Sequence, residues 1–315
     1  MQLGLIGLGR MGGNMRDRLR TAGHEVIGYD PRPEVSDVES LEALAKALSA
    51  PRVVWVMVPS GEPTRSTVRA LADVLEAGDL VIDGGNSRYT DDGPNAALLG
   101  EKGIGYLDVG VSGGVWGKAN GYGLMAGGAP EHVERAMPIF DALRPEGPRE
   151  EGFVHAGPVG AGHFSKMVHN GIEYGLMQAY AEGYELLSAA DLITNVPGVL
   201  QAWSRGTVVR SWLLDLLVVA LKQDPGLVSL EDYVEDSGEG RWTIEEAIKH
   251  AVPLPVISAA LFARFASRQD ASPAMKAVAA LRHQFGGHAV RSAAGPAGTP
   301  GEHAGPSSGT GSTQN

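Results

Sequence analysis

The chain has 315 residues, which exceeds the size that one hydrophobic core usually supports, so we expect two domains. Hydrophobic residues make up 43% and charged residues 20% of the chain, as in ordinary globular proteins and unlike disordered or fibrous ones. The formal net charge of −11 argues against general affinity for nucleic acid or for an anionic membrane. The sequence contains no cysteine, which excludes disulfides and thiolate catalysis.

The sequence predicts neither a secretory signal nor a membrane span. The chain begins with the strand-like MQLGLIGLG and lacks the basic, apolar and small-residue segments of a secretory signal. The apolar run over residues 212–221 is too short to cross a bilayer and contains Asp215. We therefore expect a cytoplasmic protein with no membrane partner.

Short apolar runs alternate with helical stretches over residues 1–160. The predicted strands are QLGLIG, EVIGYD, VVWVMVP, DLVIDGG, GIGYLDVG and YGLMAGG. Such alternation predicts parallel βαβ units, with ligands bound at the carboxyl ends of the strands. The first predicted domain is therefore an α/β, doubly wound (Rossmann) dinucleotide-binding domain.

Residues 161–290 show longer segments with helical spacing, including HFSKMVHNGIEYGLMQAYAEGYELLSAA and IEEAIKHAVPLPVISAALFARF. Pro253 and Pro255 are expected to mark a helix start or break. The second predicted domain is all-α, with roles in substrate binding and dimerisation. Residues 291–315 are mainly Gly, Ser, Pro and Thr and predict a disordered tail.

A GxGxxG motif lies between the first predicted strand and a helix expected over residues 14–22. Backbone N–H groups of such a turn, together with the helix N-terminus, can hold a pyrophosphate. The glycines could instead serve only a tight turn, but a second strand ending in an aspartate supplies the required context. The predicted cofactor contacts are Gly7, Leu8, Gly9, Arg10, Met11, Gly12, Asp30, Val58 and Asn86.

The choice of cofactor depends on Asp30, which lies 18 residues beyond Gly12. A carboxylate at this place hydrogen-bonds the adenosine ribose hydroxyls and repels a 2′-phosphate, which favours NAD over NADP. Arg32 could pair with that phosphate, so NADP stays as the second choice. Asp30 could also simply begin a turn with Pro31.

Five polar residues share one face of a predicted helix that is otherwise apolar or small. At 3.6 residues per turn, the positions i, i+3, i+4, i+7 and i+8 fall together; they are Lys166, His169, Asn170, Glu173 and Tyr174. A buried lysine and glutamate cost several kcal/mol unless they are paired, so they form either a salt bridge or part of a pocket. Five varied polar groups are more than a bridge needs, and we expect a ligand pocket.

Two glycine-rich loops and two arginines complete the candidate residues. Asn86 in DGGNS and Ser112 in VSGG offer hydrogen bonds where glycines let backbone approach a ligand, although turn formation alone would also explain the loops. Arg264 in AALFARF and Arg282 before FGGH would each, taken singly, be read as surface side chains.

With these residues assembled, the sequence closely resembles the 6-phosphogluconate dehydrogenases, in their shorter form, over residues 1 to about 290. The segments GLGRMG, VSGG and the GxxxK run at 162–166 are shared with the wider β-hydroxyacid dehydrogenases. The segments DGGNS, KMVHNGIEYG, GRWT, FARF and FGGH are the discriminating ones. The resemblance implies oxidative decarboxylation of 6-phosphogluconate to ribulose 5-phosphate and CO2, with NAD as the cofactor and no metal.

The same resemblance implies roles for individual residues. Lys166 would act as general base on the C3 hydroxyl and Glu173 as general acid, with His169 and Asn170 supporting orientation. The implied substrate contacts are Asn86, Ser112, Gly113, Gly114, His169, Asn170, Tyr174, Arg264, Arg282 and His288. In the family, the last two are often supplied by a neighbouring subunit.

The sequence departs from the family pattern in two places. Longer members carry a phosphate-contacting lysine in a KGTGKWT run, and this chain has Ser237 at that position; Arg241 could be nearby but is not equivalent. The second helical half of the longer form is also missing. Long apolar helices still predict a homodimer as the minimum assembly, with a homotetramer as the alternative.

Two other functions stay open at this point. A related β-hydroxyacid dehydrogenase acting on a small unphosphorylated acid would keep the dinucleotide motif, Ser112, Lys166 and Asn170. It would leave five residues without a role: His169, Glu173, Arg264, Arg282 and His288. A dinucleotide-binding sensor without turnover would need neither the lysine nor the glutamate.

Overall fold

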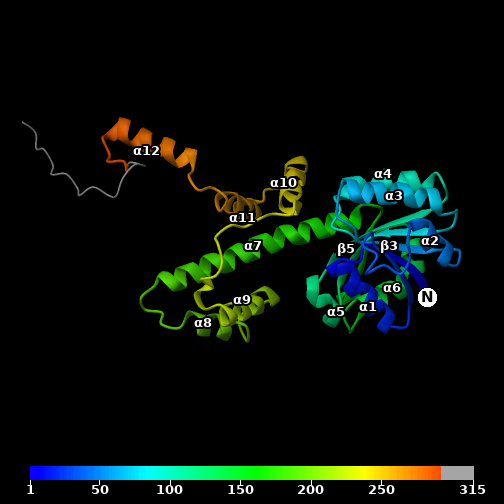
Figure 1. Ribbon diagram of the computed structural model, residues 1–315. Helices are drawn as coiled ribbons and strands as arrows, with labels where there is room; N and C mark the ends of the chain where they lie inside the picture. Colours follow the sequence, from blue (N-terminus) through cyan, green and yellow to red (C-terminus); the bar gives the residue numbers. More distant parts are fainter. Residues whose placement is uncertain (292–315) are drawn as a thin grey trace, which may run out of the picture. The chain divides into compact units, whose positions relative to one another are not determined.

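The computed structural model describes residues 1–291, and the rest of the predicted tail lies outside the described residues. The chain divides into two compact units, Met1–Arg264 and Phe265–Asn315. The first unit contains a β-sheet followed by helices (Figure 1). In its described part, the second unit contains α12 (Pro273–Gly286).

The sheet has seven strands in the order β2-β1-β3-β4-β5-β6-β7. Their bounds are β1 (Gln2–Ile6), β2 (Glu25–Tyr29), β3 (Val53–Val56), β4 (Leu80–Asp83), β5 (Gly105–Ser112), β6 (Gly123–Gly128) and β7 (Phe153–Gly157). Neighbouring strands are parallel except for β5 and β6. The predicted doubly wound α/β fold is confirmed, and so are all six predicted strands.

Two details of the sheet differ from the prediction. Strand β6 runs antiparallel to β5, because the connection between them holds only η1 (Gly114–Trp116) and α5 (Gly117–Asn120). A parallel crossover needs a dozen or more residues, usually with a full helix. Strand β7 was missed: Phe153 is its one buried residue, so FVHAG lacks the apolar pattern by which strands are recognised.

Helices cover both faces of the sheet. One face packs against α1 (Arg10–Thr21) and α6 (Pro130–Leu143), with Trp55 and Phe140 fully buried between the layers. The other face packs against α2 (Leu41–Ala47), α3 (Glu62–Val74) and α4 (Tyr89–Gly100). The helix expected over residues 14–22 begins earlier, at Arg10, so its N-terminus lies directly at the glycine motif.

The remainder of the first unit is helical, as predicted. It contains η2 (Arg149–Glu151), α7 (Ala161–Ala189), α8 (Val196–Trp203), α9 (Trp212–Gln223), η3 (Pro225–Leu227) and α10 (Glu239–Lys249), and α11 (Pro255–Ala266) runs across the boundary of the units. The expected break at the prolines is confirmed, since α11 starts at Pro255. Among the described residues, no helix is both long and apolar enough to span a bilayer.

Candidate active site

The N-terminus of α7 is fixed to the sheet by a buried carboxylate. Asp108 on β5 is fully buried and accepts hydrogen bonds from the backbone N–H of Gly160 at 2.7 Å and of His163 at 2.9 Å. The first N–H groups of a helix have no acceptor within the helix, and a negative charge beside them is favourable. Asp108 therefore sets where α7 begins.

Close packing of α7 on β5 requires Gly110. A Cβ atom at this position would lie 2.5 Å from the Cβ of Lys166 and 2.7 Å from the backbone oxygen of Gly162. Real Cβ atoms essentially never approach so closely, so a side chain here would push the helix away from the strand. The glycine thus determines how near Lys166 lies to the sheet.

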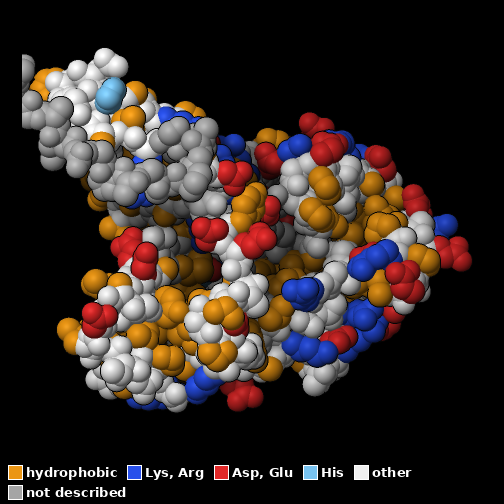
Figure 2. Space-filling model, turned by 60° about the vertical axis from the view of Figure 1, so that its left-hand side comes forward, with side chains coloured by type: hydrophobic (Ala, Val, Ile, Leu, Met, Phe, Trp, Pro, Cys, Tyr) orange, Lys and Arg blue, Asp and Glu red, His pale blue; other side chains and the backbone are white. Residues whose placement is uncertain are grey.

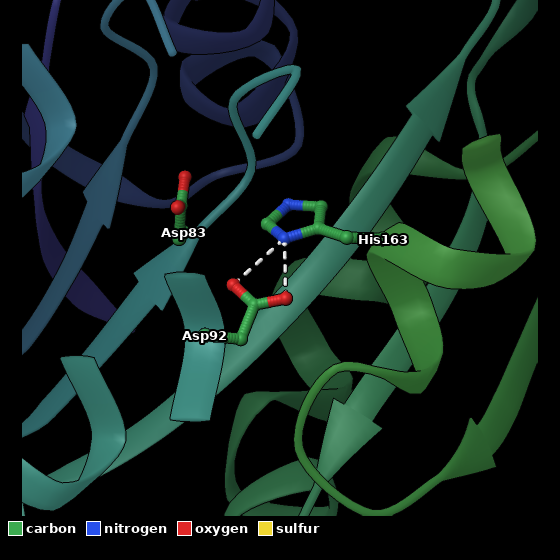
Figure 3. Close-up of side chains that lie close together, drawn as sticks. All are labelled: Asp83, Asp92 and His163. Atoms are coloured by element: carbon green, nitrogen blue, oxygen red, sulfur yellow. Dashed lines mark hydrogen bonds and ion pairs between the residues drawn. The ribbon is translucent and has the colours of Figure 1, made fainter. Parts of the chain in front are cut away.

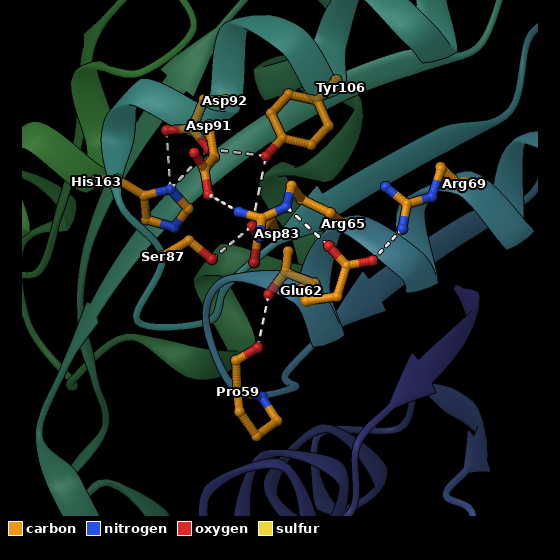
Figure 4. A network of polar contacts seen from close by, with 11 residues as sticks. Pro59, Glu62, Arg65, Arg69, Asp83, Ser87, Asp91, Asp92, Tyr106 and His163 are labelled. Carbon is orange, nitrogen blue, oxygen red and sulfur yellow. Dashed lines mark hydrogen bonds and ion pairs between the residues drawn. The ribbon is translucent and has the colours of Figure 1, made fainter.

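A buried ion pair reinforces this anchor (Figure 3). The Nδ1 atom of His163 lies 2.9 and 3.0 Å from the two carboxylate oxygens of Asp92 on α4. The hydroxyl of Tyr106 donates to Asp92 at 2.9 Å, and Ser87 donates to Asp83 at 2.8 Å. The resulting network joins β4, α4, β5 and α7 (Figure 4).

The charges of this network follow from its burial. Burial raises the pKa of Asp92 to about 6. Burial alone would lower the pKa of His163, but Asp92, Asp83 and Asp108 outweigh it and raise that pKa to about 9. His163 is therefore a cation at neutral pH. Although the ligand atoms of Asp83, Asp92 and His163 lie within 4.8 Å of one another, an imidazolium has no lone pair for a metal, so we interpret the cluster as an ion pair.

Three predicted site residues on the next turns of α7 meet Ser112 at the end of β5. Lys166 Nζ donates to Asn170 Oδ1 at 2.7 Å. His169 Nδ1 lies 3.0 Å from the same oxygen, and its Nε2 lies 3.2 Å from the hydroxyl of Ser112. Because Asn170 Oδ1 only accepts, Nδ1 carries the proton and Nε2 accepts from Ser112.

The environment of Lys166 shifts the lysine towards its neutral form. Burial lowers the pKa of this lysine, while the negative charges of Glu173 and Glu239 oppose the change. A lysine must lose its proton before it can act as a base, so a lowered pKa suits that role.

Glu239 was not predicted as a site residue. It is 2% exposed at the start of α10, and it accepts hydrogen bonds from Asn170 Nδ2 at 3.0 Å, from Ser237 Oγ at 2.7 Å and from Asn86 Nδ2. Its local sequence carries little signal, because a single acidic residue between glycines normally lies in a solvated turn. Ser237, where the resemblance implies a lysine, uses its hydroxyl for this contact.

The side chains of Tyr174 and Arg264 pack against each other. Tyr174 is 5% exposed, and the Arg264 guanidinium lies 3.4 Å from the centre of its ring, a cation–π contact. The Tyr174 hydroxyl accepts from the backbone N–H of Ser237 at 3.3 Å. Arg241 instead pairs with Asp236 at 2.8 Å.

The prediction that the whole polar face of α7 is interior is wrong in part. The side chains of His169 and Glu173 are 42% and 37% exposed, and Ile172 is 52% exposed. Half of the buried residues of the helix are glycines, and one of them, Gly171, packs against Thr243 of α10. The helical spacing could show which residues share a face, but not which face is covered.

A cavity of about 550 Å³ adjoins these residues. Ser112, Gly113 and His169 line one part of it, so the loop after β5 opens directly into this space. Much of its remaining wall is apolar, with Trp116, Met125, Phe153 and Trp212.

The glycine motif has the shape that a dinucleotide requires. A Cβ at Gly12 would lie 1.9 Å from the backbone oxygen of Gly7, which itself has a φ of +87°. No other described atom lies within 4 Å of a Cβ built at Gly9, so the loop surface there is open to a ligand. These features match close backbone approach to a pyrophosphate at the N-terminus of α1.

Asp30 lies at the end of β2 beside this loop. It accepts a hydrogen bond from the backbone N–H of Leu8 at 2.8 Å and from Arg32 Nε at 2.9 Å. These contacts, led by the side chain of Arg32, lower the pKa of Asp30 to about 2. Asp30 is therefore ionised across the physiological range, and Arg32 is engaged with it.

Two predicted substrate contacts, Arg282 and His288, belong to the second unit. Arg282 lies on α12, and the backbone oxygen of His288 is 2.9 Å from His283 Nδ1. Their place relative to the site stays a prediction.

Comparisons with known families match both halves of the chain. The NAD binding domain of 6-phosphogluconate dehydrogenase matches residues 2–145, and the 6-phosphogluconate dehydrogenase C-terminal domain matches residues 162–293. The chain belongs to the 6-phosphogluconate dehydrogenase family. The predicted resemblance is thereby confirmed.

Two relatives of similar length support the assignment. A putative 6-phosphogluconate dehydrogenase of Bacillus subtilis is 39% identical over 299 residues, covering 92% of this chain and 99% of the relative. An NAD(+)-dependent, decarboxylating 6-phosphogluconate dehydrogenase of Haloferax volcanii is 39% identical over 300 residues, covering 92% and 98%.

Longer relatives match over part of their length. The Plasmodium falciparum 6-phosphogluconate dehydrogenase structure has a TM-score of 0.78 and 27% identity, covering 91% of this chain and 65% of that one. A second Bacillus subtilis enzyme of this family is 35% identical, and the chain spans 61% of it. The short family form expected from the sequence is thus consistent with the lengths of the first two relatives.

Proposed function

We propose that this protein oxidises and decarboxylates 6-phospho-D-gluconate to D-ribulose 5-phosphate and CO2, with reduction of NAD. The observation that carries the proposal is the half-buried cluster around Lys166, which places a lysine of lowered pKa beside Asn170, His169 and Ser112. The names of the two relatives of similar length support the substrate and the decarboxylation.

The glycine loop and Asp30 would hold the cofactor. The open backbone at Gly9 would face the pyrophosphate, and the ionised Asp30 would accept hydrogen bonds from the ribose hydroxyls. NAD is preferred because Arg32 is already paired with Asp30 and a 2′-phosphate would meet a carboxylate. When bound, the nicotinamide supplies the hydride acceptor.

Lys166 would begin the reaction as a neutral base that removes the proton of the C3 hydroxyl while the hydride leaves C3. Burial supports the neutral form, and the amide oxygen of Asn170 holds the nitrogen in place. The 3-keto acid then loses CO2, and protonated Lys166 stabilises the developing enolate oxygen. Glu173 delivers a proton to C1 of the enediol.

Substrate recognition would use both sides of α7. Asn86, Ser112, Gly113 and Gly114 would contact hydroxyls from the loops, together with His169 and Asn170. Tyr174 and Arg264 would bind the phosphate end, and Arg282 and His288 stay the further contacts that the family resemblance implies. The cation–π contact keeps the Arg264 guanidinium at Tyr174 and supports this placement.

We further propose that the protein is a homodimer at minimum. Apolar side chains gather on the face drawn in Figure 2. Among all described residues, the large apolar side chains that are more than 40% exposed include Ile172, Leu176 and Leu186 of α7 and Phe262 of α11. Exposed apolar area of this kind favours association with a second copy.

Replacing Lys166 with Met tests the proposal. Wild type is expected to release CO2 and form NADH in equal amounts from 6-phosphogluconate. The variant should lose about 10²- to 10⁴-fold in turnover, the usual contribution of a positioned base. It should also fail to decarboxylate added 3-keto acid.

Lys118→Met is the matched control, since Lys118 is an exposed lysine paired with Asp17. Near-normal turnover in Lys166→Met, measured by NADH absorbance and by product analysis, contradicts the assigned role. NADH formation without CO2 in the wild type contradicts the proposed reaction.

A further inference from the structure

The amide of Asn170 has a defined orientation in the site. Its oxygen faces two donors, Lys166 Nζ and His169 Nδ1, so its Nδ2 must point the other way. There it donates to Glu239 Oε1 at 3.0 Å. A flipped amide would place its NH₂ group against the two donors and lose all three contacts.

Both carboxylate oxygens of Glu239 accept hydrogen bonds that hold the side chain in place. Oε1 also accepts from Asn86 of the DGGNS loop, and Oε2 accepts from Ser237 Oγ at 2.7 Å. All of these partners donate, which is the arrangement that a carboxylate requires. The group is 2% exposed, so its hydrogen bonds are little weakened by water.

We propose that Glu239 is a positioning residue of the reaction centre, which fixes the Asn170 amide with its oxygen towards Lys166 and ties α7 to the DGGNS loop. The inference rests on the proposed function, because it assigns Glu239 to the support of the base in that reaction. It adds a role for α10 that the predicted residues did not include.

The same carboxylate adds a negative charge to the surroundings of Lys166. The charged and titratable groups facing the lysine are His169 and Glu173 on α7 and Glu239 on α10. Their neighbours from the sheet, Asn86 and Ser112, are neutral. Glu239 and Glu173 both raise the pKa of Lys166 against the effect of burial, so removing one charge lowers it.

Glu239→Gln removes the negative charge of the side chain but keeps its size and its hydrogen bonds. A glutamine oxygen can still accept from Asn86 and Asn170, and its NH₂ group can donate to the Ser237 hydroxyl. We expect the acid limb of the kcat/KM profile to be displaced by about one pH unit to lower pH, because one negative charge near Lys166 is removed. Glu239→Ala removes both functions and should lower kcat about 10- to 100-fold while NAD affinity is kept.

Glu246→Gln is the matched control. Glu246 is a 4% exposed carboxylate on the same helix, paired with Lys249. Its variant should leave the pH profile unmoved. The proposal is overturned if Glu239→Gln has the wild-type profile, if Glu239→Ala keeps wild-type kcat, or if both glutamine variants shift the profile equally.

The protonation of Lys166 can be followed without turnover. The full chain is labelled competitively with acetic anhydride over a range of pH, and mass spectrometry measures how much Lys166 is acetylated. Glu239→Gln should show half-maximal labelling of Lys166 at lower pH than wild type, and an unchanged value overturns the inference. This readout works even if wild type fails to turn over 6-phosphogluconate, so failure of the reaction and failure of the positioning role are distinguished. Because the labelling uses Glu239→Gln, it also tests the proposal if Glu239→Ala does not fold.

Discussion

Replacing His163 with Gln should destabilise the protein in a pH-dependent way. The histidine is 1% exposed and is paired with Asp92, with Asp83 and Asp108 nearby, so its loss leaves buried carboxylates without their cation. Removing one partner of a buried pair typically costs about 3–5 kcal/mol. We expect a loss of this size near pH 6, where the histidine is charged in the folded and largely in the unfolded state.

The pH dependence follows from the raised pKa. His163 titrates near 6.5 when unfolded and at about 9 when folded, so its stabilising effect is complete below pH 6.5 and lost as the pH rises through 9. This difference corresponds to roughly 3 kcal/mol. The pKa of Asp92 is also raised, to about 6, so its ionisation lowers the free energy of unfolding further as the pH rises from 4 to 6. The gap in unfolding free energy between wild type and His163→Gln should therefore narrow between pH 6 and 10, by at most about 3 kcal/mol because Asp92 also titrates in the variant.

Urea unfolding followed by circular dichroism at several pH values measures this gap. His250→Gln is the control, because its side chain is 65% exposed and lies outside the network. A constant gap across this pH range would refute the electrostatic account. A variant as stable as wild type at pH 6 would refute the role of His163 as the anchor of α7.

Two further variants test the cofactor loop and the packing of the catalytic helix. Asp30→Ala should raise the KM for NAD about tenfold, the value of one charge-assisted hydrogen bond, and leave the KM for NADP unchanged or lower; equal effects on both cofactors would argue against ribose recognition. Gly110→Ala should lower kcat by at least about tenfold, because the new Cβ displaces Lys166, whose own Cβ would lie 2.5 Å away. Wild-type kinetics in this variant would show that the helix can move freely.

Local patterns in the sequence predicted the parts of the site that depend on neighbours along the chain. The glycine motif follows a buried strand, and helical spacing places Lys166 beside Asn170. Glu239 could not be predicted in the same way, because it lies 69 residues from Asn170 and meets it only after α10 has packed on α7. A pattern on one helix does not report what another helix brings to it.

The buried anchor shows a similar limit. Asp108 is a lone charge within an apolar strand, which is a signal that could have been found, since such a group needs a partner. Its partners, the N–H groups of Gly160 and His163, come from another element and carry no side-chain signature. Exposure of His169 was missed for the related reason that spacing cannot show which face of a helix is covered.

Steady-state assays with 6-phosphogluconate and with gluconate, each with NAD and with NADP, test the central claim most directly. We expect NADH and CO2 from 6-phosphogluconate with NAD, weaker use of NADP, and a kcat/KM for gluconate lower by about 10³-fold, because the cations that bind the phosphate are left without it. Equal use of gluconate and 6-phosphogluconate would contradict the account and favour a dehydrogenase of unphosphorylated acids.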